Sequence, residues 1–135
     1  MQIDHNNLPC CDVRLCDQVF KAADNDSCYA IFTLPSCACG VTIEEGSGAP
    51  WLRLTPAVQL PPCTREGFGR FQFEHPNAEL VDLVADTRDG EITLRRDLPN
   101  LDPATIEPVL QEALTWIDTV GYPAITFYIH TACRQ

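Results

Sequence analysis

The first patterned part of the chain has the spacing of an amphipathic helix. Its apolar residues recur at intervals of three and four positions: Leu8, Cys11, Leu15 and Val19. Asn6 or Asn7 can cap such a helix, because an amide oxygen accepts hydrogen bonds from the first helical turn. The pattern predicts a helix that ends near Ala23, and turn-forming residues follow at 24–27.

Three short segments then alternate in the way that is typical of β-strands: Tyr29 to Leu34, Ala38 to Glu44 and Trp51 to Leu60. Residues that suit turns separate them, at 35–36 and at 46–50. This order predicts an antiparallel meander. The third strand has one buried and one wetter face, because two sets alternate: Trp51, Arg53 and Thr55, and Leu52, Leu54 and Pro56. Pro56 favours a sheet edge or a bulge.

The segment 63–71 has only a weak helical pattern, because two glycines interrupt it. A β-hairpin is predicted beyond it, with strands at 80–85 and 91–96. The Asp89-Gly90 step supplies the positive φ angles that a tight hairpin loop requires.

A long amphipathic helix is predicted near the C-terminus. Its apolar stripe contains Ile106, Val109, Leu110, Ala113, Leu114, Ile117 and Val120, and its polar face contains Glu107, Gln111, Glu112, Thr115 and Asp118. Thr105 is favoured over Asp102 as the cap, because it places Pro108 in the first turn. Gly121 and Pro123 are expected to end the helix. Three alternating apolar residues then predict an additional strand: Ile125, Phe127 and Ile129.

These elements combine into a single α+β domain over residues 1–135, with no internal repeat or linker. A chain of this length can bury roughly two-thirds of the surface that it exposes when unfolded. The expected fold is an antiparallel β-sheet with flanking N-terminal and C-terminal helices.

The charge balance narrows the choice of partners. Nine Lys and Arg against nineteen Asp and Glu give a formal net charge of −10. Such a field repels phosphate backbones and anionic lipids, so nucleic-acid and membrane binding are not expected. The chain has neither a long apolar segment nor the basic and apolar start of a signal peptide, so a cytoplasmic location is expected.

Cysteine is unusually frequent, at positions 10, 11, 16, 28, 37, 39, 63 and 133. Without an export signal, reduced thiols that pack as small apolar side chains are favoured over disulfides. An alternative is a cysteine-based metal or redox protein. In that case Cys37 and Cys39, on one side of an extended segment, act with the N-terminal Cys10, Cys11 and Cys16.

Motifs for catalysis are not found. The sequence contains no His-Glu-x-x-His, Walker or nucleophile-elbow pattern, and Gly67-Phe68-Gly69 is only half of a dinucleotide fingerprint. The acidic turns lack the ligand ladder of a calcium loop. We therefore expect no enzyme activity, no catalytic residues and no cofactor. A small enzyme whose site is assembled from scattered residues is a third possibility, for which the sequence gives no positive signal.

The order of elements resembles that of the type III secretion chaperones and the related YbjN-like family. The residues that carry the resemblance are Leu80-Val81-Asp82-Leu83-Val84-Ala85-Asp86, Asp89-Gly90-Glu91-Ile92-Thr93-Leu94, Leu98-Pro99-Asn100-Leu101-Asp102 and the helix from Ile106 to Val120. The resemblance implies a non-catalytic, chaperone-like protein that holds an extended segment of a partner protein, and it also implies a homodimer. Strand addition and groove binding are the two physical modes for such a client.

The candidate partner-binding surface combines the first predicted helix with the neighbouring strand. Its residues are Cys16, Phe20, Trp51 and Leu54. Burial in the core is the alternative role for these apolar side chains.

Overall fold

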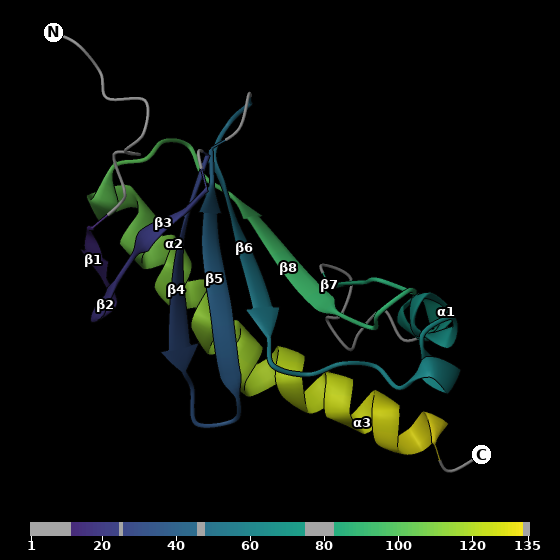
Figure 1. Ribbon diagram of the computed structural model, residues 1–135. Coiled ribbons are helices and arrows are strands. Elements are labelled where there is room, and N and C mark those ends of the chain that lie inside the picture. Colours follow the sequence, from purple (N-terminus) through teal and green to yellow (C-terminus); the bar gives the residue numbers. More distant parts are fainter. Residues whose placement is uncertain (1–11, 25, 46–47, 75–82, 134–135) are drawn as a thin grey trace, which may run out of the picture.

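The computed structural model describes residues 12–24, 26–45, 48–74 and 83–133. Its central element is a six-stranded antiparallel sheet with the order β3-β4-β5-β6-β8-β7 (Figure 1). The strands are β3 (Lys21–Asp24), β4 (Ser27–Thr33), β5 (Ala38–Glu44), β6 (Trp51–Pro56), β7 (Leu83–Ala85) and β8 (Ile92–Asp97). The predicted three-stranded meander is confirmed as β4, β5 and β6, which are antiparallel neighbours.

The predicted N-terminal helix is wrong over its described part. Residues 14–24 form β1 (Arg14–Leu15), β2 (Gln18–Val19) and β3 instead, and β1 pairs with β2 in a hairpin. Leu15 and Phe20 are buried, whereas Val19 is only half-buried. The helical spacing of Leu15 and Val19 was therefore coincidental. The predicted cap residues and Leu8 and Cys11 lie outside the described residues.

The third strand of the meander lies inside the sheet, between β5 and β8. Its predicted two-faced pattern is confirmed, because Leu52 and Leu54 are fully buried and Arg53 is exposed. Pro56 is accommodated because it is the last residue of β6 and pairs only with Cys39 on β5. Its missing N–H therefore removes no hydrogen bond to β8, whose pairing with β6 ends at Leu54.

The predicted C-terminal hairpin is confirmed for its described residues, with β7 antiparallel to β8. Its loop depends on Gly90, which has a φ of 77° and whose N–H donates to the Asp86 carbonyl at 2.7 Å. A Cβ at Gly90 would collide with the Leu60 carbonyl oxygen. Glycine is required here for both conformation and space.

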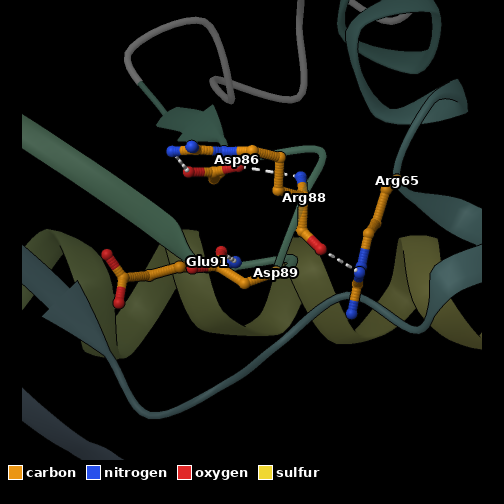
Figure 2. A network of polar contacts seen from close by, with 5 residues as sticks. All are labelled: Arg65, Asp86, Arg88, Asp89 and Glu91. Carbon is orange, nitrogen blue, oxygen red and sulfur yellow. Dashed lines mark hydrogen bonds and ion pairs between the residues drawn. The ribbon is translucent and has the colours of Figure 1, made fainter.

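A polar network fixes this loop against the segment that precedes α1 (Figure 2). Arg65 donates to the carbonyls of Leu60 at 2.9 Å and Arg88 at 2.7 Å. Arg88 in turn contacts Asp86 at 3.1 Å, and its hydrogen bonds lower the pKa of that carboxyl. The side chain of Asp89 accepts from the Glu91 N–H at 2.9 Å. These acidic residues are thus used within the turn itself.

The segment after β6 contains a short 3₁₀ turn, η1 (Pro62–Thr64), and the helix α1 (Gly67–Glu74). The weak helix expected at 63–71 is therefore present, although it starts later and extends further. Phe68 is its buried anchor.

The C-terminal helix is longer than predicted. It comprises α2 (Pro103–Trp116), a π-helical turn η3 (Ile117–Gly121) and α3 (Tyr122–Ala132). The strand predicted at 125–129 is wrong: Ile117, Gly121, Ile125 and Tyr128 continue one buried stripe at helical spacing. Gly121 and Pro123 do not end the helix, because the π turn precedes Pro123 and places it in the first turn of α3.

The cap of this helix also differs from the prediction. Asp102, not Thr105, is the N-cap, and its carboxylate accepts from the Ala104 N–H at 3.0 Å. Pro108 consequently lies inside α2, where it cannot donate to a preceding carbonyl. Buried Ile106 and Leu110 on the same helix stabilise it against this cost.

The described part of the chain packs around one core. Helix α2 lies behind the sheet in Figure 1, while α3 continues past its lower end towards α1. Apolar residues of the sheet and of α2 form the core, including Val41, Leu52, Leu94, Leu110 and Leu114. None of the helices in the described ranges is long and apolar enough to cross a membrane. The fold is thus α+β with an antiparallel sheet and a long C-terminal helix, and the N-terminal flanking helix is not part of it.

Candidate functional site

A groove opens between the β1–β2 hairpin, the end of β4 and the outer side of α2. We call it the acidic groove. It encloses about 560 Å³ and is lined by Cys16, Asp17, Phe32, Leu34, Pro35, Glu107, Gln111, Leu114, Thr115 and Asp118. Figure 1 shows β1 and β2 beside α2.

The inner part of the groove is apolar. Phe32 and Leu114 belong to the core and expose only 5% and 6% of their surface, which places them at its floor. Leu34 is partly buried against the same core, and Pro35 lines the groove beside it. An apolar floor favours a ligand with hydrophobic side chains.

Carboxylates line the rim. Glu107 Oε2 accepts from the Cys16 N–H at 2.8 Å, and Asp118 Oδ1 accepts from the Ser36 N–H at 2.9 Å. Asp17 is the third acidic residue, and no Lys or Arg is among the lining residues of this described groove. Because a carboxylate has about four acceptor positions, Glu107 and Asp118 retain capacity for a ligand.

The turn that carries Cys16 and Asp17 has an unusual backbone. Both residues have positive φ angles, 49° and 69°, in the two-residue loop between Leu15 and Gln18. Asn and Gly are the residues that ordinarily fill such a loop, since a Cβ disfavours this conformation. The hydrogen bond from Cys16 to Glu107 connects the turn to α2 and holds it over the groove.

The Cys16 thiol is not set up as a nucleophile. Burial raises its pKa above the ordinary thiol value, and the nearby carboxylates of Glu107 and Asp17 raise it further. The thiol therefore stays protonated at neutral pH, whereas a nucleophile or metal ligand must be a thiolate. Its Sγ lies 3.8 Å from the Glu107 carbonyl oxygen, as a weak donor.

The four residues predicted to bind a partner do not share one surface. Phe20 and Leu54 are fully buried in the core. Cys16 lines the acidic groove, and half-buried Trp51 lies on the opposite face of the sheet. Of these four residues, only Cys16 and Trp51 are therefore accessible to a partner in the folded chain.

The opposite face of the sheet carries Trp51 between two arginines. The guanidinium carbons of Arg53 and Arg95 lie 5.1 Å and 4.2 Å from its ring centre. Arg53 also pairs with Glu44 at 3.2 Å. The indole is thus covered by cations, which makes it a poor anchor for a basic ligand.

The cysteines proposed as a metal or redox site are arranged differently from that hypothesis. Cys39 is fully buried, and burial together with the neighbouring Cys37 raises its pKa to about 12. Within the described ranges, no three His, Cys, Asp or Glu residues are grouped so that they could hold a metal ion. Cys10 and Cys11 lie outside those ranges.

Not all the thiols are free. Cys28 on β4 is disulfide-bonded and fully buried. The other five cysteines of the described chain are free. The expectation that every cysteine is reduced is therefore wrong for Cys28.

Sequence reasoning missed the acidic groove because it assigned Glu107 and Asp118 to a solvated helix face. A signal was present: Glu107, Gln111, Thr115 and Asp118 follow one another at intervals of four, four and three residues. This spacing places them along one side of a helix. The opposing wall could not be anticipated, since the segment around Cys16 was predicted to be helical.

Comparison with known proteins finds no matching family model, no matching curated protein and no matching solved structure.

Proposed function

We propose that the chain is a non-catalytic protein-binding domain that holds an extended, basic segment of a partner protein in the acidic groove. The observation that carries this proposal is the pairing of an apolar floor at Phe32 and Leu114 with a rim that contains Asp17, Glu107 and Asp118. A peptide that alternates basic and apolar side chains matches both features, because successive side chains of an extended chain point in opposite directions.

The size of the groove supports a short anchoring segment. A volume of about 560 Å³ lies in the usual range for small-ligand pockets, so it holds a few side chains of a peptide. Affinity would come from one or two apolar anchors, and the carboxylates would select for Lys or Arg beside them.

Groove binding is favoured over strand addition. The sheet edge at β3 has only four residues, and its register with β4 shifts between Ala22 and Asp24. Short, irregular edge strands are poor templates for another strand. The wall formed by α2 and the start of η3 is longer, and it carries Glu107 and Asp118 on the side of the groove.

The overall charge supports the same type of client. A net charge of −10 attracts basic segments over a distance and repels other acidic chains. The resemblance to the secretion chaperones implies the same role, although the N-terminal helix that was part of the resembling order is replaced here by β1, β2 and β3.

Peptide binding with charge-neutral variants tests the proposal. A fluorescent peptide of alternating Lys and Leu is titrated with the full chain, and anisotropy gives the dissociation constant. The double variant Glu107→Gln and Asp118→Asn keeps the shape of both side chains, including a hydrogen-bond acceptor for Cys16 and Ser36. We expect it to weaken binding about tenfold, since two partly exposed charge pairs are lost.

The matched control is Asp97→Asn with Glu112→Gln, which removes the same charge outside the acidic groove. It should change the dissociation constant by less than about twofold. Equal weakening in both double variants would mean that only net charge matters, and no binding to the original chain would also reject the proposal.

A further inference from the structure

Two exposed thiols from distant parts of the sequence meet at the C-terminal end of the fold. Cys63 lies in η1, and Cys133 is the residue that follows α3. Both are free and exposed. Cys63 lines one cavity together with Thr131 and Ala132, the two residues that directly precede Cys133.

The backbones that carry these thiols are held by packing. The Tyr128 hydroxyl on α3 donates to the Thr64 carbonyl at 2.5 Å, next to Cys63. The Tyr128 ring packs against Phe68 and Phe71 of α1, with centroid distances of 5.2 Å and 4.8 Å. The Cys133 N–H donates to the Ile129 carbonyl at 2.9 Å, so the end of α3 is also ordered.

The Tyr128 hydroxyl lies at this junction, because it donates to the carbonyl of Thr64, the residue after Cys63. Burial raises the pKa of its hydroxyl, and Cys63 and Cys133 each raise it further.

A small thiol reagent can reach this pair. A cavity of about 620 Å³ is lined by Cys63, Tyr128, Thr131 and Ala132, among others, and Ala132 directly precedes Cys133. Two other thiols are less accessible to such a reagent. Cys39 is fully buried, and Cys16 lies among carboxylates in the acidic groove.

We propose that Cys63 and Cys133 form a reversible disulfide with each other when the protein meets a low-molecular-weight disulfide such as oxidised glutathione. The Cys63 thiolate attacks one glutathione sulfur and displaces the other glutathione as a thiolate. Cys133 then loses its proton, attacks the Cys63 sulfur and displaces the second glutathione. Two protein thiols are oxidised by two electrons, and one glutathione disulfide is reduced to two thiols.

The disulfide would join the end of α3 to η1 and thereby close a loop of about 70 residues. A crosslink of this span stabilises the folded protein mainly by restricting the unfolded chain. We expect oxidation to raise the thermal midpoint by about 10 °C. Because both thiols are exposed, the bond remains accessible to reductants and can be reversed.

Peptide mapping of the full chain tests this assignment. The protein is equilibrated in glutathione redox buffers, alkylated, and digested without reduction. We expect a peptide that links Cys63 to Cys133 in the original chain and in the control Cys37→Ser. In Cys133→Ser, the mixed disulfide with glutathione should persist on Cys63, because no resolving thiol is present.

A thermal melt of the same samples provides the second readout. The midpoint should rise on oxidation in the original chain and in Cys37→Ser, and it should stay unchanged in Cys63→Ser. Glutathione on both thiols without a linked peptide would overturn the proposal, as would two thiols that stay unmodified. A linked peptide without a change in the thermal midpoint would contradict the expectation that the disulfide stabilises the fold.

Discussion

Gly121 shows how the absence of a side chain makes room for a neighbouring ring in the C-terminal helix. Its φ is −63°, so its role is not conformational freedom. A Cβ built at this position would lie 2.8 Å from the Trp116 ring, which covers the glycine. The sequence suggested a helix-ending glycine, whereas the structure uses its small size inside a π turn.

Replacing Gly121 with alanine should destabilise the protein. The added methyl group must displace the Trp116 ring, and overpacking of this kind costs about 1–3 kcal/mol. Urea denaturation gives the free energy of unfolding. The matched control is Gly69→Ala in α1, where nothing lies within 4 Å of the added Cβ. That variant should be unchanged or more stable by up to about 1 kcal/mol. A Gly121→Ala chain as stable as the original would contradict the described contact.

The helix α2 shows how local and tertiary signals compete within one element. Sequence reasoning avoided an internal proline by choosing Thr105 as the cap. The chain instead begins α2 at Pro103, with Pro108 inside, because Asp102 caps the helix and Asn100 accepts from the Asp102 N–H at 2.9 Å. Packing of the apolar stripe outweighs the propensity cost of one proline.

The two possible caps can be separated by alanine substitution. Asp102→Ala removes the side-chain acceptor for the Ala104 N–H and should lower the free energy of unfolding by about 1 kcal/mol. Thr105→Ala should change it by less than about 0.5 kcal/mol, since Thr105 lies within the helix. Chemical denaturation of both variants measures the difference. A larger loss for Thr105→Ala would support the cap that sequence reasoning favoured.

Elements whose pattern is local could be predicted from the sequence, whereas elements that depend on contacts between distant residues could not. The strands β4, β5, β6 and β8 were predicted well, since their alternation of buried and exposed positions is local. The N-terminal hairpin was missed because β1 and β2 have only two residues each. The tail from Ile125 to Ile129 was misassigned because its apolar residues fit either a strand or a helix. Packing of Tyr128 against Phe68 and Phe71 of α1 decides in favour of the helix.

The candidate site could be predicted only in part for the same reason. The polar side of α2 is visible in the sequence, but its partner wall comes from a turn about 90 residues earlier, where Cys16 donates to Glu107. Contacts of this range leave no periodic signal. Net charge, in contrast, is fixed by composition alone, and the carboxylates that line the groove have the same sign.

At the level of the whole molecule, charge and shape together make a prediction about salt. Binding of a basic peptide should weaken as ionic strength rises, because screening reduces the attraction of exposed charges. The apolar contacts with Phe32 and Leu114 should persist, so affinity should decrease to a plateau rather than vanish. Anisotropy titrations in a series of NaCl concentrations check this. Binding that is insensitive to salt would contradict a role for the carboxylates.

Chemical-shift mapping tests the groove assignment most directly. The ¹⁵N-labelled full chain is titrated with the peptide of alternating Lys and Leu, and amide spectra are recorded at each step. We predict that the largest changes occur at Cys16, Asp17, Glu107, Gln111 and Asp118. Changes confined to the opposite sheet face, around Tyr29, Ile31 and Trp51, would contradict the account, and so would a spectrum that the peptide leaves unchanged.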